Sequence, residues 1–293
     1  MFIAGIDGGG THTRVELRDQ DNHFISRTEF GPFNLNSIGE EAFRKLLAEI
    51  FTACGGMKDC ARLCIGAAGI SNPRVKEILE EELANAEFTG LCKLCGDQEI
   101  ALRGAMDTAG VALIAGTGSI CFGKNDAGNC ARAGGYGHLI DDGGSGYALG
   151  RDVLNAAVRS FDGRCSSSAM ESAVYAQLSG TAPQDIVSFV YNPATDKSAI
   201  AKFSHIALAL AEQKEPVAQE ILDRGAQALS ELVEAVQRSL SLSGCQIALL
   251  GGLLSQDNVY RQTVVSHLSH IGTPIAPAHD ALWGAAQIAW ELT

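Results

Sequence analysis

The sequence predicts an α/β protein with two similar domains, for three reasons. Residues 2–30 have the apolar alternation of three short strands, joined first by a Gly/Thr turn and then by a polar turn. The same order of elements returns in residues 111–135, about 110 positions later. Helical spacing of apolar residues fills most of the remaining chain. We therefore expect two α/β domains facing one another, residues 1–108 and 109–293.

The first half of the chain alternates strands and helices. Residues 40–56 have apolar side chains at helical spacing and end in a Gly-Gly pair, which predicts a helix. Residues 61–69 and 90–97 are compact apolar runs, and each run predicts a buried strand. A helix over 72–86, with a proline just inside its start, follows the first run, and a helix over 98–106 follows the second.

The second half is mostly helical after residue 143. Residues 145–161 and 216–242 carry helical spacing. The run 245–256 predicts a buried strand followed by a Gly-Gly turn, and two more helices close the chain. We expect that the last of these helices can pack back on the N-terminal domain.

Composition and net charge indicate which kinds of binding partner the protein can have. Of 293 residues, 46% are apolar and 19% are charged, which suffices for two ordinary cores. The net charge of −12 argues against nucleic acid or an anionic membrane as a partner. We find no signal-peptide pattern, and no apolar stretch approaches the roughly 20 residues that cross a bilayer. These observations predict a cytoplasmic protein.

The nine cysteines are an odd number, and they lie in apolar segments. Buried free thiols in a reducing compartment account for them better than a disulfide framework does. Cys92 and Cys95 have the two-residue gap of zinc and redox motifs. They fall inside an apparent buried strand, and no second pair has matching spacing, so the sequence favours no metal there.

Two glycine-rich turns carry the chemistry. Glycine has no Cβ atom, so the backbone N–H groups of a glycine-rich turn can approach phosphate oxygens closely. The turns lie in GIDGGGTHT, residues 5–13, and IAGTGS, residues 114–119, at matching places in the repeat. Asp7, at the tip of the first strand, suits Mg²⁺ directly or through water, and the two turns together can clamp one polyphosphate. The alternative is a pair of tight hairpins that need glycine only for their own backbone.

A third glycine site follows the apolar run at 246–250. Gly251 and Gly252 end this run, where an adenine ring can lie against the backbone. A simple strand-to-helix turn explains the same two glycines, and taken alone the residues favour that alternative. None of the three sites matches a P-loop or a dinucleotide-binding fingerprint.

Six segments now combine into a resemblance that covers essentially the whole chain. They are GIDGGGTHT, GAAGI, CGDQEIALRGA, IAGTGSIC, GGYGHLIDDGGSGYALG and LLGGLLS, in the order expected of the sugar-kinase and actin superfamily. In detail the sequence resembles the BadF/BadG/BcrA/BcrD ATPase family, and within it the N-acetylglucosamine kinase branch. The resemblance implies two ribonuclease-H-like (actin-like ATPase) domains, ATP and Mg²⁺ in the cleft between them, closure on a small-molecule sugar, and a homodimer.

The resemblance also implies a role for each matching residue. Asp97 falls at the catalytic base, which accepts the proton of a sugar hydroxyl, on C6, as that hydroxyl attacks the γ-phosphorus. Asp7 falls beside the metal. The sugar-contacting positions are Asn34, Ser119, Gly135, Tyr136, Gly137 and Asp142. The nucleotide-contacting positions are Gly8, Gly9, Gly10, Thr11 and Thr13 in the first phosphate loop, Gly116, Thr117, Gly118 and again Ser119 in the second, and Gly251, Gly252 and Ser255 beside the adenosine.

This chain departs from the family pattern in ways that concern the substrate. Asp97 stands in Gly-Asp-Gln, where the family often has Asn-Asp-Ala, and residues 141–145 read Asp-Asp-Gly-Gly-Ser, where it often has Gly-Asp-Glu-Gly-Ser. Tyr136 and Ala133 replace the tryptophan and cysteine of the human-type branch. The departures affect substrate identity more than reaction type. N-acetylglucosamine is the first expectation, and N-acetylmuramic acid, glucosamine and glucose stay open.

Structural roles compete with these assignments. A lone aspartate at a strand end, such as Asp97, is often a helix N-cap. Asp141 and Asp142 can cap the helix that follows them, and Asn34 can form an Asx-turn. His138 has no cysteine cluster beside it, so we interpret it as structural.

Three other functions remain as alternatives. An ATP-driven activator of a dehydratase or reductase, with an iron–sulfur cluster at a dimer interface, agrees with the nine cysteines but has no use for the sugar-loop pattern. A sugar-sensing regulator normally adds a basic helix-turn-helix segment, and this chain begins directly with its first strand. An actin-like filament protein gives no reason for Asn34 and Asp142 to face a cleft.

Overall fold

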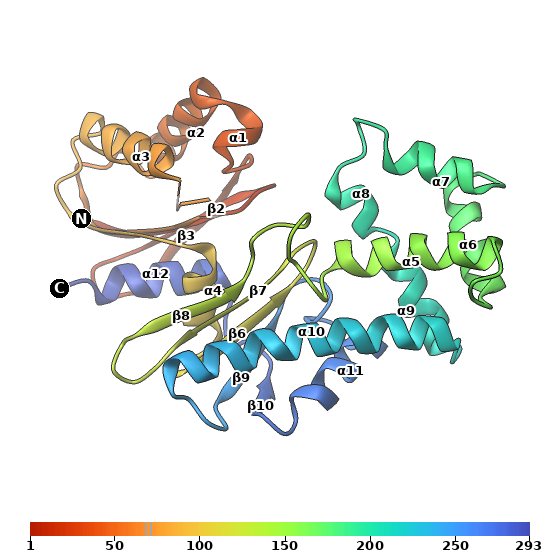
Figure 1. The fold of residues 1–293 in the computed structure, drawn as a ribbon. Helices are drawn as coiled ribbons and strands as arrows, with labels where there is room; N and C mark the ends of the chain where they lie inside the picture. Colours follow the sequence, from red (N-terminus) through yellow and green to blue (C-terminus); the bar gives the residue numbers. More distant parts are fainter. Residues whose placement is uncertain (68, 71) are drawn as a thin grey trace. The chain divides into compact units, whose positions relative to one another are not determined.

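The computed structural model describes residues 1–67, 69, 70 and 72–293, so Ala68 of the GAAGI segment lies outside the described residues. The chain divides into two compact units, drawn in Figure 1. Unit 1 comprises Met1–Asp107 and Pro277–Thr293, and unit 2 comprises Thr108–Ala276.

Unit 1 is built on a five-stranded mixed sheet with the order β3-β2-β1-β4-β5. The first three strands form an antiparallel meander, and the last two run parallel to β1. The strands are β1 (Phe2–Gly8), β2 (Thr13–Arg18), β3 (Phe24–Phe30), β4 (Cys60–Ala67) and β5 (Leu91–Cys95). The helices are α1 (Leu35–Ile38), α2 (Glu40–Ala53), α3 (Pro73–Asn85), α4 (Asp97–Ala105) and α12 (Ala281–Glu291).

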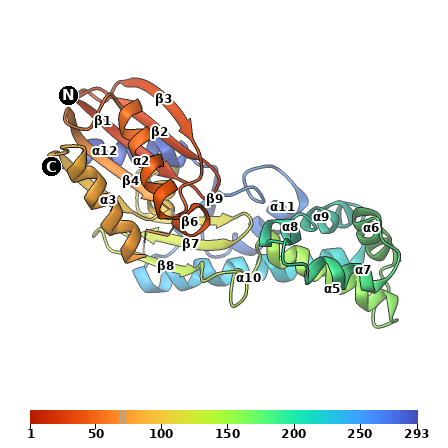
Figure 2. The same ribbon diagram turned by 90° about the horizontal axis from the view of Figure 1, so that it is seen from above.

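Helices cover both faces of this sheet, with α2 and α3 on one face and α4 and α12 on the other (Figures 1 and 2). On α2 the buried residues recur at helical spacing, with Phe43, Leu47 and Ile50 completely inaccessible. Burying one such side chain fully contributes about 1.5–3 kcal/mol. The apolar periodicity that predicts this helix is therefore also what holds it on the sheet.

Unit 2 repeats the topology. Its sheet has the order β10-β9-β6-β7-β8. Again three consecutive strands form an antiparallel meander, and two later strands run parallel to the first of them. This match confirms the predicted α/β class and the repeat. The strands are β6 (Gly110–Ala115), β7 (Ser119–Lys124), β8 (Cys130–Gly134), β9 (Gln246–Leu250) and β10 (Thr273–Ile275).

The helices of unit 2 form the rest of its core. The long α10 packs along β6, β7 and β8 and continues beyond the sheet to contact α5 and α9, as Figure 1 shows. Its apolar stripe includes Leu229, Val233 and Val236, all buried. The helices are α5 (Gly146–Phe161), α6 (Ser168–Leu178), α7 (Pro183–Val190), α8 (Lys197–Ala201), α9 (Ser204–Glu212), α10 (Pro216–Leu240) and α11 (Val259–Leu268).

The last helix, α12, belongs to unit 1 because small residues allow a very close approach. A Cβ atom on Gly5 of β1 would lie 2.3 Å from the backbone nitrogen of Ala286, and one on Gly284 would lie 2.0 Å from the carbonyl oxygen of Ile100 in α4. Only hydrogen atoms fit at these positions, so α12 rests directly on the backbones of β1 and α4.

The strand at residues 90–97 differs from its prediction. It forms β5, an edge strand, and Leu91 and Cys92 are exposed rather than buried. Because side chains alternate along a strand, Cys92 and Cys95 point to opposite faces, and the spacing of the CKLC segment cannot bring their sulfurs to one ion. Cys95 instead lies with its sulfur 3.8 Å from the sulfur of Cys64 on β4.

All nine cysteines are free. Most are buried, as expected, but Cys92 and Cys130 are exposed. The hydrogen bond with Cys95 and desolvation both raise the pKa of the Cys64 thiol, which keeps this thiol protonated and unreactive at neutral pH.

Asp280 starts α12, and we expect its loss to weaken unit 1. Its Oδ1 accepts a hydrogen bond from the backbone nitrogen of Trp283 at 2.8 Å, and its Oδ2 lies 3.1 Å from Nη1 of Arg27. Replacing an N-cap by alanine costs about 0.5–2 kcal/mol, so Asp280→Ala lowers the free energy of unfolding in urea by that amount. Asp280→Asn keeps the cap and loses only exposed ion pairs, worth roughly 0–1 kcal/mol. Equal losses in both variants would contradict a capping role.

Candidate active site

The first glycine turn joins β1 to β2 and is tied to the segment before α1. Within the turn the backbone nitrogen of Gly9 donates to the carbonyl of His12 at 3.0 Å, and the backbone nitrogen of Phe33 donates to the carbonyl of Gly9 at 2.9 Å. Thr13 is completely buried, and its hydroxyl donates to the carbonyl of Gly31 at 2.7 Å. In this conformation Thr13 therefore holds the turn in place, while Gly10 and its neighbour Thr11 are exposed.

Asn34 lies next to this turn because Phe33 anchors it there. It is the N-cap of α1, with its Oδ1 accepting from the backbone nitrogen of Asn36 at 3.1 Å. The side-chain carbonyl oxygen of Asn34 therefore has the local structural role that the Asx-turn alternative predicts. Its amide nitrogen has no hydrogen-bond partner among the described residues, so a donor remains for a ligand.

Asp7 and Asp97 lie at the same end of the unit 1 sheet. The register aligns Asp7 of β1 with Gly66 of β4, and Gly66 with Cys95 of β5. Asp97 follows two residues later, as the first residue of α4. Ligands in open α/β sheets bind at the carboxyl ends of parallel strands, which is where both carboxylates are found.

Asp97 does not cap α4. The N-cap is Gly96, without a side-chain bond, and Oδ1 of Asp97 accepts from the adjacent Gln98 nitrogen at 3.0 Å. The side chain retains access to solvent, yet the surrounding protein desolvates it, and this raises its pKa above the ordinary 3.8; the charge of Asp7 adds to the effect. A carboxyl with a raised pKa and an accessible surface is suited to accept a proton.

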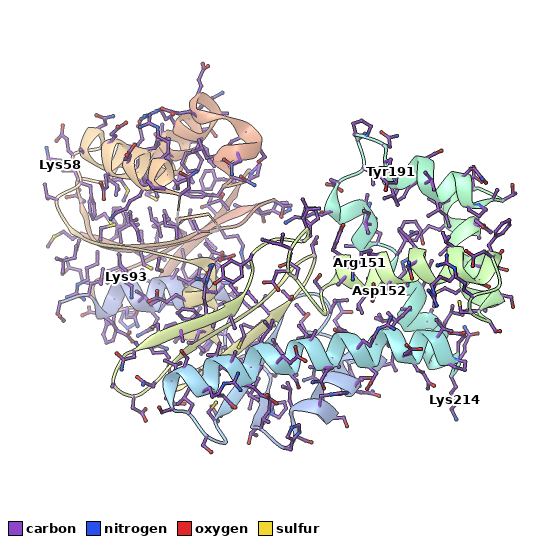
Figure 3. The ribbon with its side chains drawn as sticks, viewed as in Figure 1. Lys58, Lys93, Arg151, Asp152, Tyr191 and Lys214 are labelled. Atoms are coloured by element: carbon purple, nitrogen blue, oxygen red, sulfur yellow. The ribbon has the colours of Figure 1, made fainter. Side chains whose placement is uncertain are left out.

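An ion pair spans the β5–α4 junction that contains Asp97. Lys93, labelled in Figure 3, lies on β5, and its Nζ pairs with Oε1 of Glu99 in the first turn of α4. The pair links β5 to the first turn of α4, on either side of Asp97 in the sequence.

Arg14 faces Asp7 across the hairpin. The two residues are paired in the β1–β2 register, and Nη2 of Arg14 donates to Oδ2 of Asp7 at 2.6 Å. Nη1 of Arg14 also lies 3.6 Å from Oδ2 of Asp280. Arg14 is not among the site residues predicted from the sequence, although the spacing of the predicted hairpin places residues 7 and 14 directly opposite one another.

Asp7 fits the role of a group beside a magnesium ion. It is a largely buried carboxylate, 14% exposed, and hard oxygen donors are what Mg²⁺ prefers. Because Oδ2 is held by Arg14, the other carboxylate oxygen is the one that remains for the ion or its water.

In unit 2 the second glycine turn is bonded to the loop that contains Asp142. The backbone nitrogen of Gly146 donates to the carbonyl of Gly116 at 2.7 Å. The hydroxyl of Ser119 donates to the carbonyl of Gly143 at 2.8 Å. A Cβ on Gly118 would meet Oδ2 of Asp142 at 2.9 Å. The structure thus brings together residues that the sequence placed in the phosphate loop and in the sugar loop.

Asp142 is 4% exposed and has a left-handed backbone, with φ of 63°. A non-glycine residue in this region costs about 1–3 kcal/mol and is often found at functional sites. Neither Asp142 nor Asp141 caps the following helix; the N-cap of α5 is Ser145, which accepts from the nitrogen of Ala148 at 3.2 Å. The capping alternative is therefore wrong for both aspartates.

The predicted sugar loop at Gly135, Tyr136 and Gly137 is exposed. The Arg132 guanidinium lies over the Tyr136 ring, 4.7 Å from its centroid, and the backbone nitrogen of Tyr136 donates to Asp141 at 3.3 Å. These contacts present the aromatic ring at the surface, 61% exposed. His138 packs edge-on against Tyr147 at 4.6 Å between ring centroids, which agrees with a structural histidine.

The third glycine turn follows β9 and bonds to the strand before the second turn. The backbone nitrogen of Leu253 donates to the carbonyl of Ala115 at 3.1 Å. Gly251 has φ of +87°, and a Cβ there would lie 2.3 Å from the same carbonyl. Gly251 is thus a structural glycine, whereas Gly252 and Ser255 are exposed.

Glycines that the fold itself does not require are concentrated in these turns. Among the described glycines, only four have both open space where a Cβ atom would lie and a φ angle that other residues readily adopt. Three of the four fall in the three predicted nucleotide turns; they are Gly10, Gly116 and Gly252, and the fourth is Gly31. A hairpin alone does not explain glycine at these positions, whereas close approach of a ligand to the backbone does.

The doubled α/β topology is that of the actin-like ATPase fold. The model of the BadF/BadG/BcrA/BcrD ATPase family matches residues 4–289, and the chain belongs to this family.

Named relatives agree with this assignment. The chain is 31% identical to the N-acetylmuramic acid/N-acetylglucosamine kinase of Clostridium acetobutylicum, over 98% of both chains. It is 28% identical to the N-acetyl-D-glucosamine kinase of Dictyostelium discoideum, over 83% of this chain and 81% of the relative. Among solved structures, a candidate N-acetylglucosamine kinase from Chromobacterium violaceum shares the fold, with a TM-score of 0.76 and 24% identity over 98% of both chains. Within the described residues, no helix has the length and apolarity to cross a membrane.

Proposed function

We propose that this chain is an ATP-dependent sugar kinase that phosphorylates the 6-hydroxyl of N-acetylglucosamine. The family match and the named relatives support the class of reaction. The observation that carries the assignment of the chemistry is Asp97, a carboxylate at the strand ends with a raised pKa and no capping role. N-acetylmuramic acid is the second candidate, because the Clostridium acetobutylicum relative is named for both sugars.

Each unit contributes identifiable groups to this reaction. In unit 1, Asp97 accepts the hydroxyl proton and the amide nitrogen of Asn34 holds the sugar. In unit 2, Asp142 and Tyr136 contact the sugar. The glycine turns of both units donate backbone N–H groups to phosphate oxygens, which stabilises the charge that spreads over the transferred group.

Magnesium would be held beside Asp7, where it supplies positive charge to the phosphates. The role of Arg14 is to keep Oδ2 of Asp7 fixed, so that the remaining oxygen keeps one orientation. We further propose that the two units correspond to the two domains of the family, and that the enzyme is a cytoplasmic homodimer. Removal of divalent cations by a chelator should abolish turnover, and added Mg²⁺ should restore it.

A coupled assay of ATP consumption tests the function across N-acetylglucosamine, N-acetylmuramic acid, glucosamine and glucose. We expect the highest kcat/KM with N-acetylglucosamine. 6-Deoxy-N-acetylglucosamine lacks the accepting oxygen and should inhibit competitively without being consumed. ATP consumption that is independent of every sugar, in a brown and oxygen-sensitive protein, would contradict the proposal and favour an iron–sulfur activator.

A further inference from the structure

A buried tyrosine lies behind the loop that carries Asp142. Tyr260, the second residue of α11, has no exposed surface. Its hydroxyl donates to the carbonyl oxygen of Gly144 at 2.7 Å. Neither the motifs nor the resemblance assigns this residue a role, because it lies outside every glycine turn.

The surrounding backbone is shaped to admit that hydroxyl. A Cβ on Gly225 of α10 would lie 2.7 Å from the hydroxyl oxygen of Tyr260. A Cβ on Gly144, whose φ is +75°, would lie 2.4 Å from the carbonyl oxygen of Gly225. The loop, α10 and α11 therefore approach one another closely at these two glycines, where the side chains of Tyr260, Leu149 and Leu229 fill the remaining space.

The tyrosine itself is held at a fixed point. Asn258 caps α11, accepting from the backbone nitrogen of Arg261 at 2.9 Å, and its amide donates to the carbonyl of Leu253 at 3.0 Å. The N-terminus of α11 is therefore tied, at Asn258 two residues before Tyr260, to the preceding turn at Leu253.

Two consecutive carbonyls of the loop thus accept hydrogen bonds from side chains of two different segments. Ser119 of the second glycine turn binds the carbonyl of Gly143, and Tyr260 of α11 binds that of Gly144. Immediately before them stands Asp142, in its left-handed conformation. Hydrogen bonds to both following peptide groups stabilise a backbone conformation that an aspartate rarely adopts by itself.

We infer that Tyr260 is a positioning residue for sugar binding: its hydroxyl holds the loop of residues 142–146 so that Asp142 meets the sugar. This inference rests on the proposed function for the identity of the ligand. Because Tyr260 is completely buried and its hydroxyl bonds to the carbonyl of Gly144, it acts on the sugar through the loop and not by direct contact.

Tyr260→Phe removes only the hydroxyl and tests the inference. One hydrogen bond corresponds to about 0.5–1.5 kcal/mol, or roughly a 2- to 10-fold change. We expect KM for N-acetylglucosamine to rise by that factor while KM for ATP stays unchanged. In hydrogen exchange, the amides of Ser145, Gly146 and Tyr147, which are bonded to Asp142 and to the second turn, should exchange faster.

Tyr175→Phe is the matched control. Tyr175, on α6 in the same unit, has a buried hydroxyl without a partner among the described residues. Its removal is the same chemical change without loss of a hydrogen bond. We expect both KM values and the exchange of the loop to match those of the wild type.

The outcomes separate this inference from the proposed function. A wild type without sugar-dependent ATP consumption overturns the proposed function, and loop exchange in Tyr260→Phe then decides the positioning role alone. An active wild type with unchanged sugar KM and unchanged loop exchange in Tyr260→Phe overturns the inference only. A lowered thermal midpoint with unchanged sugar KM would also overturn it, since Tyr260 would then be merely structural. If Tyr260→Phe does not fold, Gly225→Ala displaces the hydroxyl instead and carries the same expectations.

Discussion

Replacement of Asp97 by asparagine should lower kcat for sugar phosphorylation by about 10²–10⁴-fold, the usual contribution of a general base. Asparagine keeps the size and polarity of the side chain but cannot accept the proton of the attacking hydroxyl. KM for ATP should remain unchanged, because the nucleotide-binding turns are untouched. Steady-state kinetics with varied ATP and varied sugar measures both parameters.

The matched control for this variant is Asp126→Asn. Asp126 lies in the exposed turn between β7 and β8, and the same charge loss there should leave kcat unaltered. Turnover of Asp97→Asn close to that of the wild type would remove Asp97 from the role of base.

The same substitution should stabilise the protein. Desolvation raises the pKa of Asp97 in the folded state, so the folded protein holds this proton to a higher pH than the unfolded chain does. The free energy of unfolding therefore falls as the pH rises from the pKa of Asp97 in the unfolded chain, about 3.8, to its raised pKa in the folded protein. Above that pH the free energy of unfolding stays at the lower value. Asp97→Asn should have a higher thermal midpoint than the wild type at pH 7, and the difference should shrink toward acid pH. A lower midpoint at pH 7 would contradict the raised pKa.

Methyl groups at Gly10 and Gly116 should weaken ATP binding without weakening the fold. Both positions have open space around a built Cβ and an ordinary backbone conformation, so alanine fits the free protein. A methyl there holds phosphate oxygens away from the backbone N–H groups. Loss of a hydrogen bond to a charged group costs about 1.5–3 kcal/mol, and we expect KM for ATP to rise at least about 10-fold in each variant.

Gly31→Ala provides the comparison for Gly10→Ala. It has the same open surroundings but lies outside the glycine turns. Its KM for ATP and its thermal midpoint should both stay at wild-type values. If the alanines at Gly10 and Gly116 also leave KM for ATP unchanged, the glycines serve the turns alone and the tight-hairpin interpretation holds.

Much of the fold was predictable because the repeated pattern is strong. The meander in residues 2–30 and its counterpart in residues 111–135 have clear alternation, and the buried runs on α2 and α10 have clear helical spacing. The strand Thr273–Ile275 was not predicted: it has three residues, lies at a sheet edge and is exposed or only partly buried, so no run of buried apolar residues marks it in the sequence. Edge position also explains β5, where an apolar run proved partly exposed.

The candidate site was predictable only where backbone chemistry leaves a sequence signature. Glycine turns and carboxylates at strand ends can be recognised without coordinates. Residues that act through distant partners cannot: Tyr260 bonds to Gly144, and nothing in local spacing links the two. Thr13 was assigned to the nucleotide, but its hydroxyl bonds to Gly31, a partner that the strand pattern does not reveal. The pairing of Arg14 with Asp7 was predictable in principle, because the register of the hairpin alone places the two residues opposite one another.

Phosphorus NMR of the products formed from ATP and N-acetylglucosamine shows whether the γ-phosphoryl group is transferred to the sugar. We expect ADP and one new phosphomonoester, located at carbon 6 by its coupling to the C6 protons, in equal amounts. Release of inorganic phosphate without any sugar phosphate, whether or not the sugar is present, would contradict the proposed function.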